Sequence, residues 1–596
     1  MTVKPKMPNP TMSNPDDRTP GPGEALIPRG DNAWLYTDPI SVHTTERLGA
    51  VLDTLAAVEA AVQQGHHAVG YIAYEAAPAF DPALITHSPI PGLPLLWFGI
   101  YAAPRRIPWP LALELLPTLP ETAWEPALSE AAYHAALLQI REHIARGDSY
   151  QVNYTFPLEA DVEADPFAWF CALHARQPAE HAAYIDTGRH QVLSLSPELF
   201  LRRDGQNLRS RPMKGTRPRG CWSEEDIALA EELRHAPKDQ AENVMIVDMV
   251  RNDLGHVSRP GSVSVPELFT VERYPTVWQL CSEVISDSDA DLCSLMQALF
   301  PPASVTGAPK VETMRIIHRL EPEPRGVYCG AVGWMAPDGA LSFNVPIRTL
   351  LYDRECRRAR YAVGSGVTWD SVSDAEYAEC LIKARFLHET QPDFALLESL
   401  RHDEGGYFLL AEHLERLEAS MQYWDFNGDI ADVEAALARY CETLPDTPCK
   451  VRLLYHRDGA LHIEHAPAPP TRPITLGLAL EPVDRRNRFL YHKTTARGVY
   501  DAALAAQPDC DDVLLWNEDG ELTESALANL VLRLEGQWWT PPIASGLLPG
   551  TYRRYLLRTG VIQERVLHKA DLFRAEEIAL INAVRQWIPV SELRDA

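Results

Sequence analysis

Residues 238–250, KDQAENVMIVDMV, begin with charged and amide side chains and continue as an apolar run of helical length. Asp239 and Glu242 are three residues apart, which places both carboxylates on one face of a helix. The same spacing recurs at Glu376 and Glu379 in a second predicted helix, over 374–389. Two such carboxylate pairs could hold a hard cation such as Mg²⁺, which takes oxygen ligands and keeps water in its shell.

The same spacing has an ordinary explanation, because acidic pairs are common on solvated helix faces. Residues 373–376, SDAE, also match a capping box, in which the Glu376 side chain would bond back to the start of its own helix. Both interpretations remain open on spacing alone. Two further polar segments lie in apolar surroundings, SPE at 196–198 and PMKGTR at 212–217.

Composition and charge narrow the function classes. The chain has 55 basic and 82 acidic residues, a net charge of −27, and no basic run of the kind that nucleic-acid binders show. Its ten cysteines are scattered without a C-x-x-C pair, which is typical of a reduced cytosolic protein. The N-terminus lacks the apolar core of a signal peptide, and prolines with Arg105-Arg106 interrupt the apolar stretch 89–117. We expect a cytoplasmic protein without a membrane span.

The pattern of helices and strands predicts an α+β chain with a boundary near residues 391–393. Residues 1–24, rich in Pro, Asp, Thr and Gly, are predicted to be a disordered tail. The first unit is expected to span 25–390 and the second 394–596. Helices are predicted over 130–146, 223–234, 238–252, 291–300 and 310–320, and strand-like runs over 150–158, 190–202, 327–335, 341–352 and 394–400.

Residues of about 130–390 resemble the chorismate-utilising enzymes, a family that includes anthranilate, isochorismate, salicylate and aminodeoxychorismate synthases. The matching segments occur in the family order, at 147–153, 196–198, 213–216, 241–248, 251–255, 304–310, 325–330 and 347–349. The resemblance implies the family's α+β fold of sheets flanked by helices. Lys214, before Gly-Thr, is typical of the aminodeoxychorismate synthases, whereas the other members usually have Ala there.

This resemblance implies a role for each matching residue. Lys214 would attack C2 of chorismate and expel the C4 hydroxyl, which Glu198 would protonate as general acid, before ammonia displaces the lysine. Mg²⁺ would be held directly by Glu242 and Glu379, with Asp239 and Glu376 acting nearby or through water. The implied substrate-binding residues are Arg348, Tyr328, Lys310, Gly366, Thr216 and Gln151.

Three features refine this interpretation. Gln151 stands where isochorismate and salicylate synthases have the lysine that activates water, which argues against water as the nucleophile. Gln279 stands where many relatives have His, and the family's regulatory tryptophan pocket is not recognisable within 25–120. No glutaminase segment is found, so a separate glutamine amidotransferase subunit is expected to supply the ammonia.

The second unit resembles the fold-type IV pyridoxal-phosphate enzymes, which have an α/β domain like that of the branched-chain aminotransferases. The matching segments are at 413–417, 451–453, 491–495, 522–530, 548–551 and 582–585. Lys493 would bond the cofactor aldehyde and Glu524 would keep the pyridine nitrogen protonated. Residues expected to hold the cofactor phosphate are Arg452, Thr551, Tyr552 and, at a second turn, Asn582. His413 alone is more typical of a structural helix residue, and the small N-terminal part of the family looks trimmed.

Together the two resemblances predict a bifunctional enzyme. The first unit would make 4-amino-4-deoxychorismate, and the second would remove pyruvate from it to leave 4-aminobenzoate, a folate precursor. One rival is an anthranilate- or isochorismate-type synthase fused to a branched-chain or D-amino-acid aminotransferase. Another is a chorismate-binding regulatory module without catalytic activity. A homodimer through the second unit is expected, because fold-type IV enzymes are usually dimers.

Overall fold

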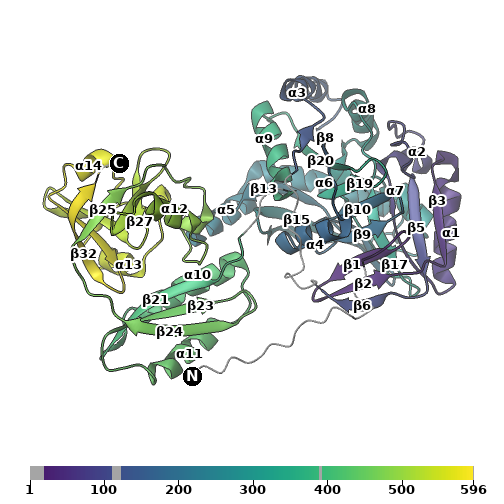
Figure 1. Ribbon diagram of the computed structural model, residues 1–596. Helices are drawn as coiled ribbons and strands as arrows, with labels where there is room; N and C mark the ends of the chain where they lie inside the picture. Colours follow the sequence, from purple (N-terminus) through teal and green to yellow (C-terminus); the bar gives the residue numbers. More distant parts are fainter. Residues whose placement is uncertain (1–18, 110–121, 388–391, 595–596) are drawn as a thin grey trace. The chain divides into compact units, whose positions relative to one another are not determined.

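The computed structural model describes residues 19–109, 122–387 and 392–594 (Figure 1). Most of the predicted tail therefore lies outside the described residues, although Glu24 is buried. The chain forms two units, one of residues 1–217 with 232–390 and one of residues 218–231 with 391–596. Within the described residues no helix has the length and apolar content that crossing a membrane requires.

The first unit is built on two large sheets, each of ten strands. The long pair β8–β20 is antiparallel, with Val152 opposite Val367 at one end and Asp161 opposite Arg358 at the other. In spatial order the first sheet contains β16 (Gly307–Ala308), β8 (Gln151–Asp161), β20 (Arg358–Val367), β19 (Thr349–Asp353), β10 (His190–Ser194), β9 (Ala183–Asp186), β1 (Ala25–Arg29), β2 (Asn32–Tyr36) and β6 (Arg105–Pro108), with β7 (Glu125–Pro126) beside β8.

The second sheet carries the strand of Lys214 at one edge. In spatial order it contains β13 (Met213–Pro218), β15 (Val277–Asp287), β12 (Asn207–Arg211), β11 (Leu199–Asp204), β18 (Leu341–Asn344), β17 (Ala331–Met335), β4 (His67–Ile72), β5 (Leu96–Tyr101) and β3 (Ser41–Thr45), with β14 (Ser264–Arg273) beside β15. The predicted single strand 190–202 is wrong, because β10 and β11 belong to different sheets. Pro197 lies at this break and has no N–H to donate to a sheet.

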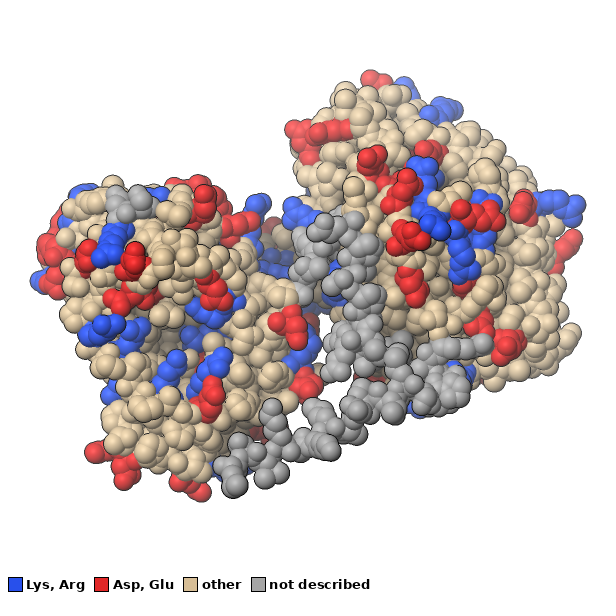
Figure 2. Space-filling view, in the orientation of Figure 1, with Lys and Arg blue, Asp and Glu red and all other residues tan. Residues whose placement is uncertain are grey.

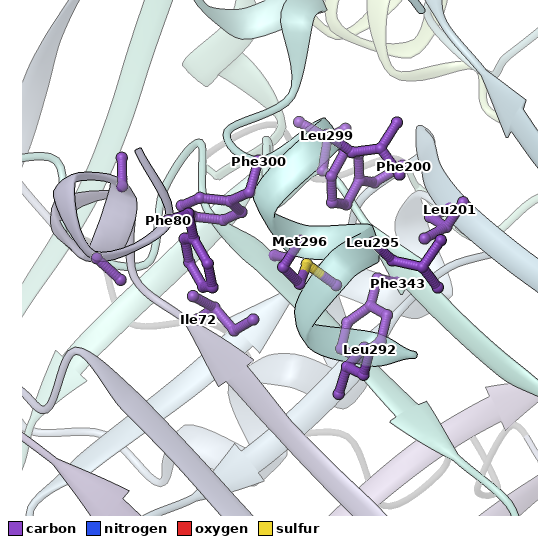
Figure 3. Close-up of a cluster of buried hydrophobic side chains, with 14 of the residues drawn as sticks. Ile72, Phe80, Phe200, Leu201, Leu292, Leu295, Met296, Leu299, Phe300 and Phe343 are labelled. Carbon is purple, nitrogen blue, oxygen red and sulfur yellow. The ribbon is translucent and has the colours of Figure 1, made fainter. Parts of the chain in front are cut away.

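Helices bury apolar faces against these sheets. Helix α7 (Leu292–Leu299) shows why: Leu292, Leu295, Met296 and Leu299 recur every three to four residues and are all buried. Figure 3 shows them packed with Phe200 and Phe343. The remaining helices of the unit are α1 (Val51–Gln63), α2 (Ala77–Phe80), α3 (Glu130–Ala145), α4 (Pro166–Arg176), α6 (Pro237–Gly255), α8 (Lys310–Leu320) and α9 (Ser373–Ala384).

The second unit has a four-stranded and an eight-stranded sheet. The smaller sheet contains, in spatial order, β22 (Gly406–Tyr407), β21 (Leu396–Asp403), β23 (Cys449–Tyr455) and β24 (Leu461–Pro467). The larger contains β27 (Leu522–Ser525), β26 (Asp512–Trp516), β25 (Ile474–Leu478), β32 (Gln586–Arg594), β31 (Glu577–Asn582), β28 (Asn529–Leu534), β29 (Gln537–Thr540) and β30 (Gln563–Glu564). Strand β27 also pairs with β28, so the strands from β27 to β28 form a closed ring that carries Glu524.

The helices of the second unit are α10 (Leu410–Trp424), α11 (Ile430–Cys441), α12 (Gly498–Ala506), α13 (Thr551–Arg558) and α14 (Lys569–Leu572). Helix α10 packs its buried residues Leu417, Met421 and Trp424 into the core of the smaller sheet.

Figure 2 shows Lys and Arg interspersed with Asp and Glu on the face in view. This mixture accords with a sequence that has no long basic run.

Residues 218–231 belong to the second unit, whereas the division expected from the sequence assigned them to the first. This segment, from which helix α5 (Ser223–His235) begins, is part of the second unit. Trp222 stacks on Tyr491, with ring centroids 5.2 Å apart. The Tyr423 hydroxyl donates to the Gly220 carbonyl oxygen over 2.6 Å. Gly220 also allows a close turn, because a Cβ there would lie 2.3 Å from the Asp226 nitrogen. These long-range contacts are invisible in the periodicity of the segment.

Candidate active sites

A cavity of about 420 Å³ in the first unit gathers most of the residues predicted from the sequence. Its walls come from both sheets and from α6 and α9, which are far apart along the chain. The predicted residues that line it are Glu198, Lys214, Thr216, Asp239, Glu242, Tyr328, Arg348, Gly366, Glu376 and Glu379.

The Lys214 amine lies beside Gly366, with Gln151 on the same side. A Cβ added to Gly366 would meet the Lys214 Nζ at 2.6 Å and would overlap the Gln151 amide nitrogen. Glycine therefore leaves room for the lysine amine in this position, and a larger residue would displace it. Burial lowers the pKa of Lys214, which increases the fraction of neutral amine available for attack near pH 7.

Glu198 lies between β10 and β11 and is 3% exposed. Burial raises the pKa of Glu198 to about 7, although Ser304 and Lys214 partly oppose the rise. Its backbone N–H donates to the Ser196 hydroxyl over 3.2 Å, which fixes the turn at Pro197. A carboxyl group that is half protonated near neutral pH is suited to act as a general acid.

The four acidic residues have different partners. Asp239 is ion-paired with Arg217 at 2.9 Å, and Glu379 with Lys383 at 2.7 Å. Glu376 accepts a hydrogen bond from the Ser371 hydroxyl, and Val372 is the N-cap of its helix, so the capping box at 373–376 does not form. Burial raises the pKa of Glu242, which nearby Lys214 opposes.

These carboxylates fit a magnesium ion only with help from other ligands. In the described part of the chain no group of three or more His, Cys, Asp or Glu is arranged to hold a metal. Mg²⁺ usually keeps several waters and binds through one or two carboxylates together with a substrate. Glu242 and Glu379, from two helices that face one cavity, satisfy that requirement.

Two predicted substrate contacts lie outside this cavity lining. The Lys310 amine pairs with Asp253 at 3.0 Å and donates to the Leu299 carbonyl oxygen. Gln151 is buried, and neither atom of its amide has a hydrogen-bond partner among the described residues. Lys383 was not predicted but lines the cavity, and its place one helical turn after Glu379 was the available signal.

The second unit holds a cavity of about 480 Å³ lined by every cofactor residue predicted there, Lys493, Glu524, Arg452, Thr551, Tyr552 and Asn582. Burial, followed by the charge of Arg416, lowers the pKa of Lys493 to about 8. A lysine that loses its proton readily can bond an aldehyde and then act as a base.

Glu524 is buried and fully bonded. It accepts hydrogen bonds from the Tyr500 hydroxyl (2.8 Å), the Leu548 N–H (3.0 Å) and the Asn529 amide (3.0 Å). Burial raises the pKa of Glu524 to about 7. An acidic side chain held by three hydrogen bonds in the wall of the cavity suits a partner for a pyridine nitrogen.

Arg416 and His413 were not among the predicted cofactor residues, yet both line this cavity. Arg416 donates to the carbonyl oxygen of Pro549 over 3.4 Å, and His413 contacts the Thr551 hydroxyl at 3.3 Å. Both therefore touch the turn predicted to hold the phosphate. Arg452 instead pairs with Glu464 at 2.9 Å, and its side chain is 42% exposed.

Comparisons with known proteins agree with this division. Residues 114–389 match the model of the chorismate binding enzymes, and residues 395–593 match that of the class IV amino-transferases. The anthranilate synthase component 1 of Streptomyces coelicolor is 34% identical over 365 residues, which cover 53% of this chain and 71% of that protein. The chain belongs to the chorismate-binding enzyme family, with a class IV aminotransferase domain after it.

Within that family, the aminodeoxychorismate synthase component 1 of Bacillus subtilis is 41% identical over 44% of this chain and 57% of its own length. The chain spans between a third and two thirds of the length of several such synthases. The anthranilate synthase component I structure from Streptococcus pneumoniae has the same fold, with a TM-score of 0.53 and 24% identity over 60% of this chain and 92% of that one.

Proposed function

We propose that the first unit aminates chorismate to 4-amino-4-deoxychorismate through a covalent bond to Lys214. The observation that carries this proposal is the half-buried Lys214 side chain, whose amine lies next to Gly366 in the same cavity as Glu198. Similarity to synthases that carry this name supports it. The lysine is also the residue that distinguishes amination at C4 from the reactions of the other family members.

Each step uses a group of this cavity. The neutral amine of Lys214 bonds to ring carbon C2, the double bond shifts, and the C4–O bond breaks. Glu198 gives its proton to the departing hydroxyl, which leaves as water. Ammonia then bonds to C4, the double bond shifts back, and the C2–N bond to Lys214 breaks. The new C4 ammonium gives one proton back to Glu198, which restores the acid. The sum is chorismate plus ammonia giving 4-amino-4-deoxychorismate plus water.

The carboxylates of chorismate need positive partners within this acidic cavity. Arg348 and Lys383 line its wall, and Arg348 is the predicted contact for a carboxylate. Glu242 and Glu379 would hold Mg²⁺, which supplies positive charge to the ring carboxylate when bound. Ammonia would come from a separate glutamine amidotransferase.

We propose that the second unit is an aminodeoxychorismate lyase that uses pyridoxal phosphate. The cofactor, when bound, withdraws electrons from the carbon whose C–H bond breaks. Lys493 would remove the proton from ring carbon C4, and pyruvate would leave from C3, which aromatises the ring. Arg416, Thr551 and Tyr552 would hold the phosphate, with Arg452 as the alternative. We further propose a cytoplasmic homodimer that serves folate synthesis.

The direct test gives the purified chain chorismate, Mg²⁺, ammonium and pyridoxal phosphate, and measures 4-aminobenzoate. Lys214→Met should abolish its formation from chorismate and leave its formation from supplied 4-amino-4-deoxychorismate unchanged. Unchanged synthesis by this variant would disprove the covalent role. Anthranilate or isochorismate as product would favour the fused-aminotransferase rival, and a chain that neither turns over chorismate nor binds cofactor would be a regulatory module.

A further inference from the structure

Gln279, on β15, bonds the two residues that follow Lys214. Its Nε2 donates to the Gly215 carbonyl oxygen over 2.8 Å, and its Oε1 accepts from the Thr216 hydroxyl over 3.1 Å. The carbonyl of Gly215 can only accept, so the amide nitrogen must face it and the oxygen is left for Thr216. Both hydrogen-bonding groups of the side chain are therefore used on one short segment.

That segment has little other freedom. Gly215 has a φ of +96°, and a Cβ there would lie 3.1 Å from the Asp239 side chain. On its other side, the Asn243 amide donates to the Lys214 carbonyl oxygen over 3.4 Å and accepts from the Ser282 hydroxyl over 2.6 Å. Asn243 follows Glu242 on α6, so the backbone at Lys214 is bonded both to the sheet and to the helix that carries the acidic residues.

We propose that Gln279 is a positioning residue, which fixes the Gly215-Thr216 turn and so aims the Lys214 amine at the substrate ring. This inference rests on the proposed amination by Lys214. A displacement of about 1 Å at a reacting group can lower a rate about 100-fold. Bonds that hold the turn therefore matter to kcat more than to substrate affinity.

An amide suits this task because it does not titrate. A neutral histidine could also donate with one ring nitrogen and accept with the other, but a protonated ring donates twice and cannot accept from Thr216. An introduced imidazole would lie opposite Glu272 in the β14–β15 pair. It would line the same cavity as Lys214, Glu242 and the Asp239–Arg217 ion pair. Glu272 is itself bonded to Arg211.

The experiment compares Gln279→Met, which keeps the length but removes both bonds, with Gln279→His. For Gln279→Met we expect kcat for chorismate amination to fall about tenfold or more, with KM changing far less. The neutral ring of Gln279→His can also donate to Gly215 and accept from Thr216, so we expect its kcat to lie closer to the wild type than that of Gln279→Met. A Gln279→Met kcat within about twofold of the wild type would overturn the proposal.

Gln507→Met is the matched control, because it removes one Gln-to-carbonyl bond, to Leu478, in the second unit. It should keep the wild-type kcat. Chemical labelling of Lys214 at one fixed pH, followed by peptide mass spectrometry, needs no turnover. Gln279→Met should change the labelling rate of Lys214 relative to the wild type, and an unchanged rate would contradict the positioning role of Gln279. Failure of wild-type amination alone would instead count against the proposed function.

Discussion

Burial moves the two reactive groups of the first cavity in opposite directions. It lowers the pKa of Lys214 and raises that of Glu198 to about 7, so each approaches the charge state that its proposed role requires. One cavity thus prepares a nucleophile and an acid together. The sequence could identify both residues by their motifs, but it could not show that one cavity encloses them.

The Glu198 carboxyl predicts a pH dependence of amination. Because its pKa is about 7, its protonated fraction falls as pH rises through 7, and kcat/KM should decline on that side. The measurement holds free ammonia constant at each pH, since ammonium also titrates. Glu198→Gln should lower the rate about 10²- to 10⁴-fold and remove this decline. A decline that persists in the variant would assign it to another group.

Lys493 predicts the colour of the second unit. Lys493→Ala should remove the visible absorbance band that bound pyridoxal phosphate gives, and borohydride should no longer fix the cofactor to the chain. Lys450→Ala is the matched control, because Lys450 lines the same cavity from β23. That variant should retain the band. Equal loss in both variants would mean that the cavity, and not the bond to Lys493, determines the signal.

Cofactor residues illustrate the limit of motif reasoning at this scale. All six predicted positions line the second cavity. They could be predicted because each lies in a segment that resembles the fold-type IV enzymes. The sequence could not rank Arg416 above Arg452. That ranking depends on the contact of Arg416 with Pro549, which lies far away along the chain, and on the pairing of Arg452 with Glu464 on the neighbouring strand.

At the scale of elements, helices were predicted better than strand boundaries. The helix predicted over 310–320 coincides with α8, because its apolar residues recur with a helical period. The run 190–202 was predicted as one strand, since both halves are apolar, but it crosses between sheets at Pro197. Sheet membership depends on partners distant in sequence, which local alternation does not encode.

One buried ion pair joins strand β21 to helix α10. Glu398 accepts from Arg416 at 2.6 and 2.9 Å and from His413 at 2.6 Å. Burial alone would raise the pKa of Glu398, but Arg416 and His413 together hold it at about 2. Its folded pKa lies below the unfolded value, so the stability it contributes is present above pH 4.5 and is lost as pH falls toward 2.

We therefore expect Glu398→Gln to lower the free energy of unfolding of the second unit by about 3–5 kcal/mol at pH 7, because it leaves Arg416 buried without its partner. Urea unfolding followed by cofactor absorbance measures this change. Glu464→Gln, which breaks the exposed pair with Arg452, is the control and should change stability little. Similar losses in the two variants would contradict the special role of the buried pair.

At the scale of the whole molecule, the existence of two units could be predicted from the sequence, but which unit contains residues 218–231 could not. The break near residue 391 follows from the end of a helical pattern and a new strand. The membership of 218–231 depends on the stacking of Trp222 on Tyr491 and on the hydrogen bond from Tyr423 to Gly220. Neither contact has a local signature.

Trp222→Ala tests this membership in the full chain. Tyr491 is two residues before Lys493, so loss of the stacked ring should destabilise the second unit by about 1 kcal/mol beyond the lost apolar burial. Urea unfolding monitored by cofactor absorbance reports on that unit. Trp369→Ala, which removes a 53% exposed ring of the first unit, is the control. An unchanged second-unit transition in Trp222→Ala would contradict the assignment of the segment.

The inclusion of residues 218–231 in the second unit has a consequence for any division of the chain into two separate polypeptides. The segment leaves the first unit four residues after Lys214 and returns before α6, which carries Glu242. A gene cut at codon 390 would thus leave residues 218–231 on the first product and deprive the second product of a segment of its own unit.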